Sequence, residues 1–337
     1  LHNAVVSRIK TLSRLDMAEK RRPQDGRIKM EKNDSEVEIR VSTIPVAFGE
    51  KVVLRIMDPD VLFQDLEMLG FFKEEFESYR QLISLPFGIV LVTGPTGSGK
   101  STTLYSSLRM LSTPEVNITT IEDPIEMIHE EFNQIAVQPI IDVTFGGVLR
   151  NILRQDPDIV MVGEIRDLET AQAAVQAALT GHLVLSTLHT NDAVSTVFRL
   201  LDLGVPPYLI HSSLNGVVAQ RLVRKICPHC IQTFEMTATE LAEIGLRIKG
   251  KESFLLKHGK GCQKCRHTGY MGRTGIYEVL PYSENLKRLT ASETSIDAMR
   301  KKAMAEGLTL LRQNGIKKML KGITTYQEVL RVTWDVF

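Results

Sequence analysis

Apolar residues recur along the chain in two patterns, and the change between them predicts its first elements. Helical spacing across 1–20 gives way to two alternating stretches, 36–42 and 51–57, which predict half-buried strands. The stretch 21–27 is rich in turn-forming residues, and 45–50 is expected to be a loop. The beginning of the chain therefore predicts a small α/β domain.

Short, continuous apolar runs follow, each bounded by residues that favour turns or helix caps. Such runs predict buried strands, and they cover 89–93, 118–122, 158–164 and 183–189. Between them, 172–180 is alanine-rich and ends at Gly181, and Asp192 is placed to cap a helix running through 198–203. Strands alternating with helices predict a mostly parallel sheet with helices on both faces.

From about residue 221 the pattern changes again. Apart from an insert that carries cysteines, we expect this part to be mostly helical, with repeated apolar positions over 286–320 and breaks at Gly307 and Gly315. The predicted organisation is a first domain at 1–60, a linker at 61–75 and a larger domain at 76–337 that contains the insert 226–266.

Composition and charge exclude some classes of protein. The chain has 337 residues, 43% hydrophobic and 24% charged, with a formal net charge of +1. This is long enough for two or three domains, and the balanced charge gives no global basic field for nucleic acid or an anionic membrane. There is no apolar run of transmembrane length and no signal-peptide pattern. Because the chain begins at Leu1 rather than Met, we expect upstream domains to be missing.

The strongest chemical signal is Gly-Pro-Thr-Gly-Ser-Gly-Lys-Ser at 94–101, which fits the phosphate-loop pattern at every fixed position. It stands between the apolar run 88–93 and a helical stretch, 101–111, so its glycines and the helix N-terminus can surround phosphates. We expect Lys100 to neutralise phosphate charge and Ser101 to ligate magnesium. The predicted nucleotide-binding residues are Gly94, Pro95, Thr96, Gly97, Ser98, Gly99, Lys100, Ser101 and Thr102.

Acidic residues end two of the predicted strands. Glu164 ends one run, and Glu122 and Asp123 end another. The carboxyl ends of parallel strands face the ligand crevice, so these acids are expected to converge near the phosphates. There, a carboxylate can reach the magnesium shell or orient the attacking water. For Asp123 the alternative is a turn cap before Pro124, and Glu126 is expected to be solvated.

Two histidines flank the last predicted strand. His182 precedes it and His189 ends it. A histidine at a strand end can detect a γ-phosphate through a hydrogen bond, but an isolated histidine is more often structural. Their spacing alone leaves both interpretations open.

All four cysteines occur in two Cys-x-x-Cys pairs, Cys227/Cys230 and Cys262/Cys265, with 31 residues between the pairs. Four thiolates make a closed tetrahedral zinc site, whereas a redox role needs only one pair. We therefore predict structural zinc bound by Cys227, Cys230, Cys262 and Cys265. The nearby His229 and His267 are not expected to be ligands.

Together these motifs resemble the secretion-ATPase superfamily, the motors of type II secretion and type IV pilus assembly. The resemblance covers nearly the whole chain. The matching motifs are the phosphate loop, with Ser-Thr-Thr-Leu after Lys100, the aspartate box 121–126, the Walker B stretch 153–167, the histidine box 180–192 and the C-terminal segment 322–331.

The resemblance implies an α/β fold: a RecA-like P-loop ATPase domain preceded by a small, PAS-like second N-terminal domain, with a tetracysteine zinc insert and a helical C-terminal part. Glu164 matches the general base or water-orienting acid, and Glu122 the aspartate-box acid near metal and γ-phosphate. His182 and His189 match the histidine-box positions. The segment 66–71 resembles the stretch that packs near the nucleotide base.

The superfamily also places arginines from a neighbouring subunit at the nucleotide. Arg40 and Arg55, one on each predicted strand of the first domain, fit that role best. The alternative is that both are solvated charges on a strand face. An arginine supplied in trans strongly stabilises transition-state charge, which favours the functional interpretation.

By resemblance, the expected cofactors are ATP, Mg²⁺ and Zn²⁺, and the expected assembly is a homohexamer. It would work with an inner-membrane platform protein on the cytoplasmic face of the bacterial inner membrane, associating with the membrane through partners and not binding nucleic acid directly. The zinc insert favours the pilus-assembly or secretion branch over retraction motors.

Two other function classes compete with this motor. The first is a DNA-translocating or DNA-uptake RecA-type motor, which local basic patches at Lys317–Lys318 and 221–225 keep open. The second is a scaffold that binds nucleotide without hydrolysing it, which intact Lys100, Ser101 and Glu164 argue against. Pilus assembly, protein secretion and DNA uptake share one motor core, so the motifs do not choose among them.

Overall fold

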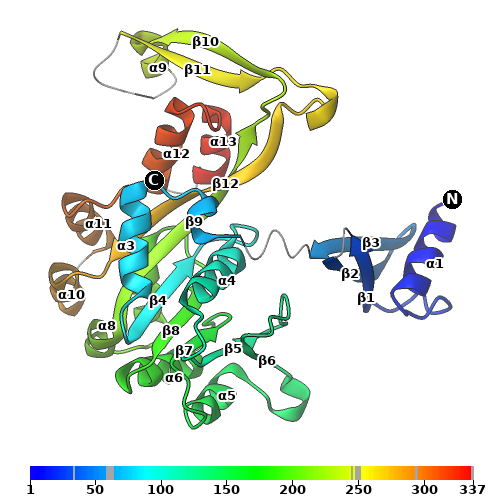
Figure 1. The fold of residues 1–337 in the computed structure, drawn as a ribbon, viewed down its shortest axis with the longest axis horizontal. Helices are drawn as coiled ribbons and strands as arrows, with labels where there is room; N and C mark the ends of the chain where they lie inside the picture. The colour runs from blue at the N-terminus through cyan, green and yellow to red at the C-terminus, as the bar shows by residue number, and fades with distance from the viewer. Residues whose placement is uncertain (33–34, 58–63, 244–245, 247–251, 293–294, 335–337) are drawn as a thin grey trace. The chain divides into compact units, whose positions relative to one another are not determined.

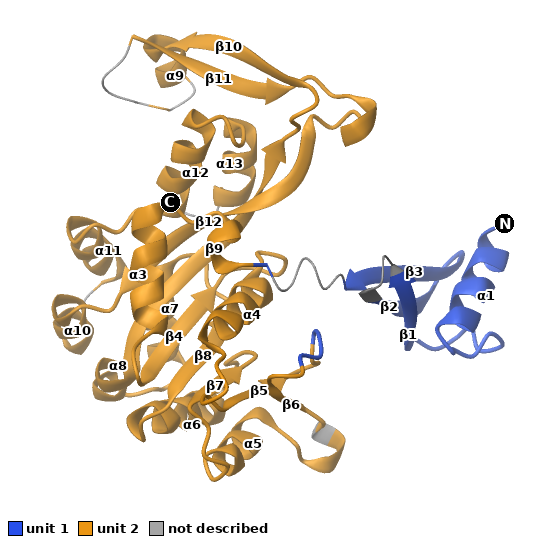
Figure 2. Ribbon diagram, viewed as in Figure 1, with its two compact units in different colours: residues 1–64, 126–129 blue, residues 65–125, 130–337 orange. Residues whose placement is uncertain are grey.

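The computed structural model describes residues 1–32, 35–57, 64–243, 246, 252–292 and 295–334. They form two compact units, residues 1–64 with 126–129 and residues 65–125 with 130–337 (Figure 2). The expected boundary at residue 60 and the linker residues 61–63 lie outside the described residues. The rest of the expected linker, from Asp65 to residue 75, belongs to the second unit. Leu66 and Leu69 are buried there, and the Phe71 ring stacks on Tyr277 with centroids 3.6 Å apart.

The first unit is one helix and a three-stranded antiparallel sheet. Its elements are α1 (His2–Leu12), β1 (Gln24–Lys32), β2 (Ser35–Val46) and β3 (Gly49–Met57), with sheet order β1-β2-β3 (Figure 1). The helix ends well before residue 20, and β1 begins inside the stretch expected to be a turn. Backbone pairing with β2 along the whole of β1 explains that strand, because cross-strand partners outweigh local turn preference.

The sheet of the first unit buries one face. Val37 and Val41 of β2 are buried together with Val6 of α1. Lys10 of α1 is also buried, 1% exposed, where it forms an ion pair with Glu50 of β3. Because side chains alternate across a strand, the intervening residues of β2 point to the opposite face.

The second unit is built on a seven-stranded sheet with the order β12-β9-β4-β8-β7-β5-β6 (Figure 1). Neighbouring strands are parallel except β12, which is antiparallel to β9. This confirms the mostly parallel sheet. The strands are β4 (Gly88–Thr93), β5 (Ile118–Glu122), β6 (Asn133–Ala136), β7 (Ile159–Val162), β8 (Leu183–Leu188), β9 (Leu214–Ile226) and β12 (Tyr270–Pro281).

Helices cover both faces of this sheet, as the sequence predicts. Ile89 and Leu91 of β4 join the main core, whereas Val90 and Val92, also fully buried, point the other way. Asp192 caps α7 by accepting the backbone N–H of Ser195. The helices around the sheet are α3 (Lys73–Ile83), α4 (Lys100–Leu111), α5 (Phe145–Ile152), α6 (Leu168–Leu179), α7 (Ala193–Asp202) and α8 (Pro207–Ser213), with short 3-10 turns at Leu66–Leu69 and Pro139–Ile141.

The expectation of a mostly helical part beyond residue 221 is wrong up to Pro281, because β9 and β12 extend the sheet there. Gly307 follows a helix with φ 103°, as expected of a break. Gly315 instead lies inside a helix, where an added Cβ would come within 2.7 Å of Val329. Close packing of two helices explains this glycine. The final helices are α10 (Glu284–Ala291), α11 (Ile296–Ala305), α12 (Leu311–Leu320) and α13 (Tyr326–Thr333).

The insert between β9 and β12 is an antiparallel hairpin. It comprises β10 (Ile231–Thr237), α9 (Ala238–Glu243), β11 (Ser253–Gly259) and a 3-10 turn at Gln263–Cys265. Leu241, Leu246 and Leu256 of the insert form a small core with Met319 of α12. Across the described ranges, no helix combines the length and the apolar content that spanning a bilayer requires.

Candidate nucleotide site and metal centre

The phosphate loop connects β4 to α4. Thr93, the last residue of β4, donates its hydroxyl to Leu188 O at 3.0 Å, which ties the ends of β4 and β8 together. Gly97 and Gly99 adopt φ of 78° and 90°, a region that favours glycine, and Gly99 forms the N-cap of α4. The loop therefore leads into an exposed helix N-terminus, the geometry that binds phosphate.

Lys100 is the first residue of α4, directly after Gly99 of this loop. Its ammonium donates to Gly94 O at 2.8 Å and Pro95 O at 3.3 Å. Burial lowers the pKa of Lys100 to about 8; the Glu164 carboxylate opposes this shift and the positive charge of Arg221 adds to it. Phosphate bound in the loop would stabilise the charged amine. The Ser101 hydroxyl is exposed in the first turn of α4, where a magnesium ligand is expected.

Glu164 and His189 come together beyond the ends of β7 and β8. The Glu164 carboxylate forms an ion pair with Arg166 and lies 3.4 Å from Nε2 of His189. Burial and the nearby charge of Lys100 lower the pKa of His189, whereas Glu164 acts in the opposite direction. The net effect favours the neutral form of His189. Lys100, Glu164 and His189 thus lie at one edge of the sheet, the edge formed by the carboxyl ends of its parallel strands.

Glu122 is placed differently from the expectation of an acid facing metal and γ-phosphate. It is 4% exposed and accepts hydrogen bonds from Tyr105 of α4 at 2.5 Å, Thr120 at 2.7 Å and Gln134 at 3.1 Å. The carboxylate is thus held in a buried network that ties β5 to α4 and β6. Of the two acids at this strand end, Asp123 is the exposed one.

His182 is not brought to the phosphate loop of its own chain. Its Nδ1 lies 2.9 Å from Ala177 O and 3.1 Å from the Thr180 hydroxyl, at the amino end of β8. Six strand residues separate it from the other end, a distance of roughly 20 Å at about 3.3 Å per residue. The structure therefore places His182 at the start of β8, away from the end of the strand where the phosphate loop lies.

Three arginines of the first unit form a row on the sheet face opposite the buried valines. Arg27 pairs with Arg40 across β1 and β2, and Arg40 pairs with Arg55 across β2 and β3. Arg40 donates to the Glu126 carboxylate at 3.0 Å, so Glu126 is half-buried and paired rather than solvated. Sequence reasoning missed Arg27, because its strand was expected to be a turn.

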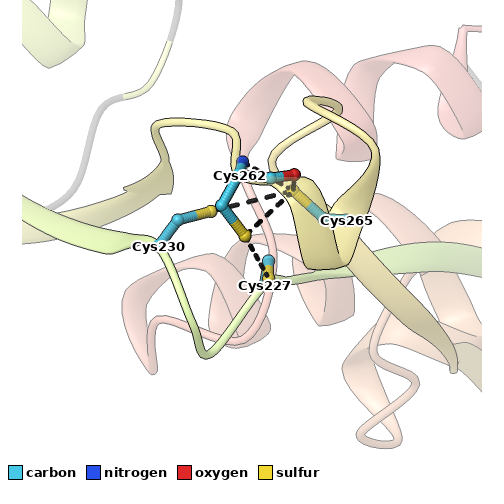
Figure 3. A group of neighbouring side chains, drawn as sticks. All are labelled: Cys227, Cys230, Cys262 and Cys265. Atoms are coloured by element: carbon cyan, nitrogen blue, oxygen red, sulfur yellow. Dashed lines mark hydrogen bonds between the residues drawn. The ribbon is translucent and has the colours of Figure 1, made fainter.

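The four cysteine sulfurs converge from the two loops that flank the hairpin (Figure 3). The Sγ distances are 4.0 Å for Cys227–Cys262, 3.9 Å for Cys230–Cys265 and 3.8 Å for Cys262–Cys265. A tetrahedron with zinc–sulfur bonds of about 2.3 Å has edges of about 3.8 Å, whereas a disulfide is about 2 Å long. The donor set therefore fits zinc.

Backbone amides support the same interpretation. Burial raises the pKa of Cys265, but N–H groups of Cys262, at 3.1 Å, and Gly269, at 3.3 Å, together with the Cys262 and Cys230 thiols, outweigh it and lower this pKa. Within the same cluster the pKa of Cys230 is raised, mainly by burial. Stabilised thiolate is the form that binds metal. Among the described residues, the convergent donors are the four cysteines, so His229 and His267 do not join them.

Comparison with known proteins decides the family. A family model described as "Type II/IV secretion system protein" matches residues 1–331. The chain belongs to this family. It is 51% identical over 331 residues to the type IV pilus assembly ATPase TfpB of Acinetobacter baylyi, covering 98% of this chain and 57% of that protein. It is also 51% identical over 333 residues to the type II secretion system ATPase E of Vibrio cholerae, covering 99% and 66% respectively.

Solved structures agree with this membership. The pilus retraction motor PilT with bound ADP aligns with TM-score 0.64 and 26% identity, covering 93% of this chain and 78% of that one. The ATPase DotB of Yersinia pseudotuberculosis aligns with TM-score 0.72 at 19% identity, covering 99% and 83%, and so supports the fold. The chain spans about 57% to 66% of the length of the first two relatives, which contain further sequence.

Proposed function

We propose that the chain is the motor part of an ATPase that drives type IV pilus assembly or type II protein secretion. The observation that carries the proposal is the convergence of Lys100, Glu164 and His189 around the phosphate loop. These residues supply a phosphate-binding cation, an acid and a neutral hydrogen-bonding ring at one strand edge. The relatives' names, pilus assembly and secretion ATPases, support the same function.

In the proposed reaction the loop amides and Lys100 bind the β- and γ-phosphates, and Glu164 orients the attacking water. His189, held 3.4 Å from Glu164, is placed to sense the γ-phosphate by hydrogen bond. Ser101 and an acid at this edge, Asp123 or Glu164, would hold magnesium, which supplies charge neutralisation to the phosphates. Glu122 acts at a distance, by fixing α4 through Tyr105.

We further propose that the motor is a homohexamer in which Arg40 and Arg55 act on a neighbouring subunit's nucleotide. Their cross-strand register with Arg27 places three guanidinium groups on one sheet face. Glu38 pairs there with Arg27 and Arg40, and Glu126 with Arg40, so a neighbour's triphosphate would compete with these carboxylates for the arginines. Zinc in the cysteine site would be structural, because four sulfurs leave no open position. The proposed partner is a platform protein at the cytoplasmic face of the inner membrane.

The test is magnesium-dependent ATP hydrolysis measured per chain across a range of protein concentrations. A specific rate that rises with concentration and then saturates supports sites completed by neighbouring subunits. Lys100→Ala should abolish nucleotide binding or turnover with the fold retained. Hydrolysis at the unaltered rate in that variant would mean that the site is misassigned. A folded chain that binds but never hydrolyses ATP would favour a nucleotide-dependent scaffold.

One observation favours a second candidate, a DNA-translocating motor. The structure brings Lys317 and Lys318 of α12 and Lys321, which follows that helix, around the ring of Phe72, with ammonium-to-centroid distances of 6.0, 5.2 and 4.5 Å. Helix α12 also contacts β9, the strand that carries 221–225, so the two basic sequence patches lie near one another, with Lys318 itself only 2% exposed. Stimulation of hydrolysis by single-stranded DNA, falling steeply with salt, would favour this candidate.

A further inference from the structure

Strand β9, beside the phosphate loop, carries two buried polar residues that lie outside the ATPase boxes. In the parallel pairing of β9 with β4, Ala219 lies opposite Thr93. Gln220 and Arg221 therefore lie next to the loop that begins at Gly94. Their side chains are only 1% and 5% exposed, a degree of burial that glutamine and arginine reach only when they are bound by other groups.

Gln220 fixes the phosphate loop and the helix that follows it. Its Nε2 donates to Ser98 O at 2.8 Å, and its Oε1 accepts the Thr103 hydroxyl at 2.8 Å. Its carbonyl oxygen lies so close to Gly94 that an added Cβ there would come within 2.5 Å of it. The loop is thus held against β9 at its start, its middle and the first turn of α4.

Arg221 extends this attachment to the residues after β8. Its Nη1 donates to Gln220 O at 3.2 Å, and its Nη2 donates to Asn191 O at 3.0 Å and Oδ1 at 3.3 Å. Asn191 is two residues beyond His189. From the other side, Thr93 accepts the backbone N–H of Thr190 at 2.9 Å. The segment 189–191 is therefore held between β4 and β9.

We propose that Arg221 is a positioning residue for ATP hydrolysis, which fixes the segment 189–191 against the phosphate loop so that His189 faces Glu164. The inference rests on the proposed function and deepens it. Because the Arg221 side chain is only 5% exposed and these hydrogen bonds join it to Gln220 and Asn191, the proposed role acts through His189. A small displacement of a reacting group is costly, since about 1 Å of misplacement can lower a rate about 100-fold.

The test separates positioning from charge and from fold stability. Arg221→Lys keeps the charge but lacks the planar fork that spans Asn191 and Gln220 together. We expect Arg221→Lys and Arg221→Met to lower kcat about tenfold or more, with the Kd for ATP changed less than about threefold. Thermal unfolding of each variant shows whether the fold is intact.

A milder variant keeps the inference testable if both changes at Arg221 prevent folding. Asn191 is exposed. Asn191→Ala removes its side-chain oxygen Oδ1, one acceptor for Arg221, and leaves its backbone oxygen, the other. We expect it to lower kcat about threefold, in the same direction. Asn285→Ala is the matched control, because its hydrogen bond to Glu306, at 2.8 Å, lies outside the site. It should leave kcat unchanged.

A double-mutant cycle with His189→Ala decides whether Arg221 acts through His189. We expect Arg221→Lys, or Asn191→Ala in its place, to change kcat less than about twofold once His189 is removed. Two results would overturn the inference while leaving the proposed function standing. One is an undiminished kcat in Arg221→Lys, or in Asn191→Ala if that variant replaces it. The other is a cycle in which the effects of the two changes on kcat simply multiply. Absence of magnesium-dependent hydrolysis in the unaltered chain would refute the proposed function, and the inference with it.

Discussion

Removing the metal from the cysteine site should unfold the insert and leave the nucleotide-binding sheet intact. The hairpin of β10 and β11 has a small core of its own, in which Leu241, Leu246 and Leu256 pack on Met319. A two-stranded hairpin is marginally stable by itself. The four sulfurs join the two ends of this excursion, so a metal bound by them would supplement the small core of the insert.

The magnitude follows from the loop that the site closes. Cys227 and Cys262 are 35 residues apart, and a cross-link over such a loop stabilises by about 4 kcal/mol through the entropy of the open chain. At about 1.4 kcal/mol per factor of ten, amides of β10 and β11 should exchange with solvent about a thousandfold faster without metal.

The assay is amide hydrogen exchange on the chain before and after chelation, with metal content measured by mass spectrometry. Amides of β4 and β8 are the internal reference and should keep their protection. Cys230→Ser should reproduce the effect of the chelator, whereas the neighbouring change His229→Ala should leave about one zinc per chain. If exchange in β10 and β11 rises less than about tenfold while zinc is lost, the metal does not hold the insert and the reasoning fails.

Four further predictions test other parts of the molecule. Glu164→Gln should keep ATP binding but lower kcat at least about 100-fold, and unchanged single-turnover kinetics would remove Glu164 from the reaction. Arg55→Ala should preserve nucleotide binding and lower turnover, and mixing it with Lys100→Ala chains should restore activity if arginines act in trans. Burial raises the pKa of Glu328, but hydrogen bonds from two arginines outweigh it and lower this pKa to about 2. Its stabilisation, up to about 2 kcal/mol, is therefore present above pH 4.5 and lost as pH falls toward 2, a trend that Glu328→Gln should flatten in thermal unfolding. Gly315→Ala should lower the melting temperature by several degrees, and unchanged melting would show that α12 and α13 can separate freely.

The sequence predicts the elements that local patterns determine and misses those that depend on distant partners. The strands β4, β5, β7 and β8 are buried on both faces and consist of apolar residues with a few threonines and a serine, apart from Glu122 at the end of β5, so they stand out in the sequence. β9 and β12 mix charged and apolar residues, because their ends extend beyond the core toward the insert. Their pairing joins residues about 50 positions apart, as in Ile276 with Arg221, which no local window contains.

The same distinction explains which site residues could be predicted. Position in the chain places Glu164 and His189 at strand ends and Lys100 after the loop that follows a third strand, and the parallel sheet brings those ends to one edge. It also puts His182 before β8 and His189 at its end, and only the histidine-box resemblance suggests His182 for the site, which the structure leaves at the amino end of the strand. Position does not give the direction of the Glu122 side chain, which depends on donors from α4 and β6. A motif therefore identifies a residue's place along the chain, whereas its chemical role depends on the neighbours that the fold brings to it.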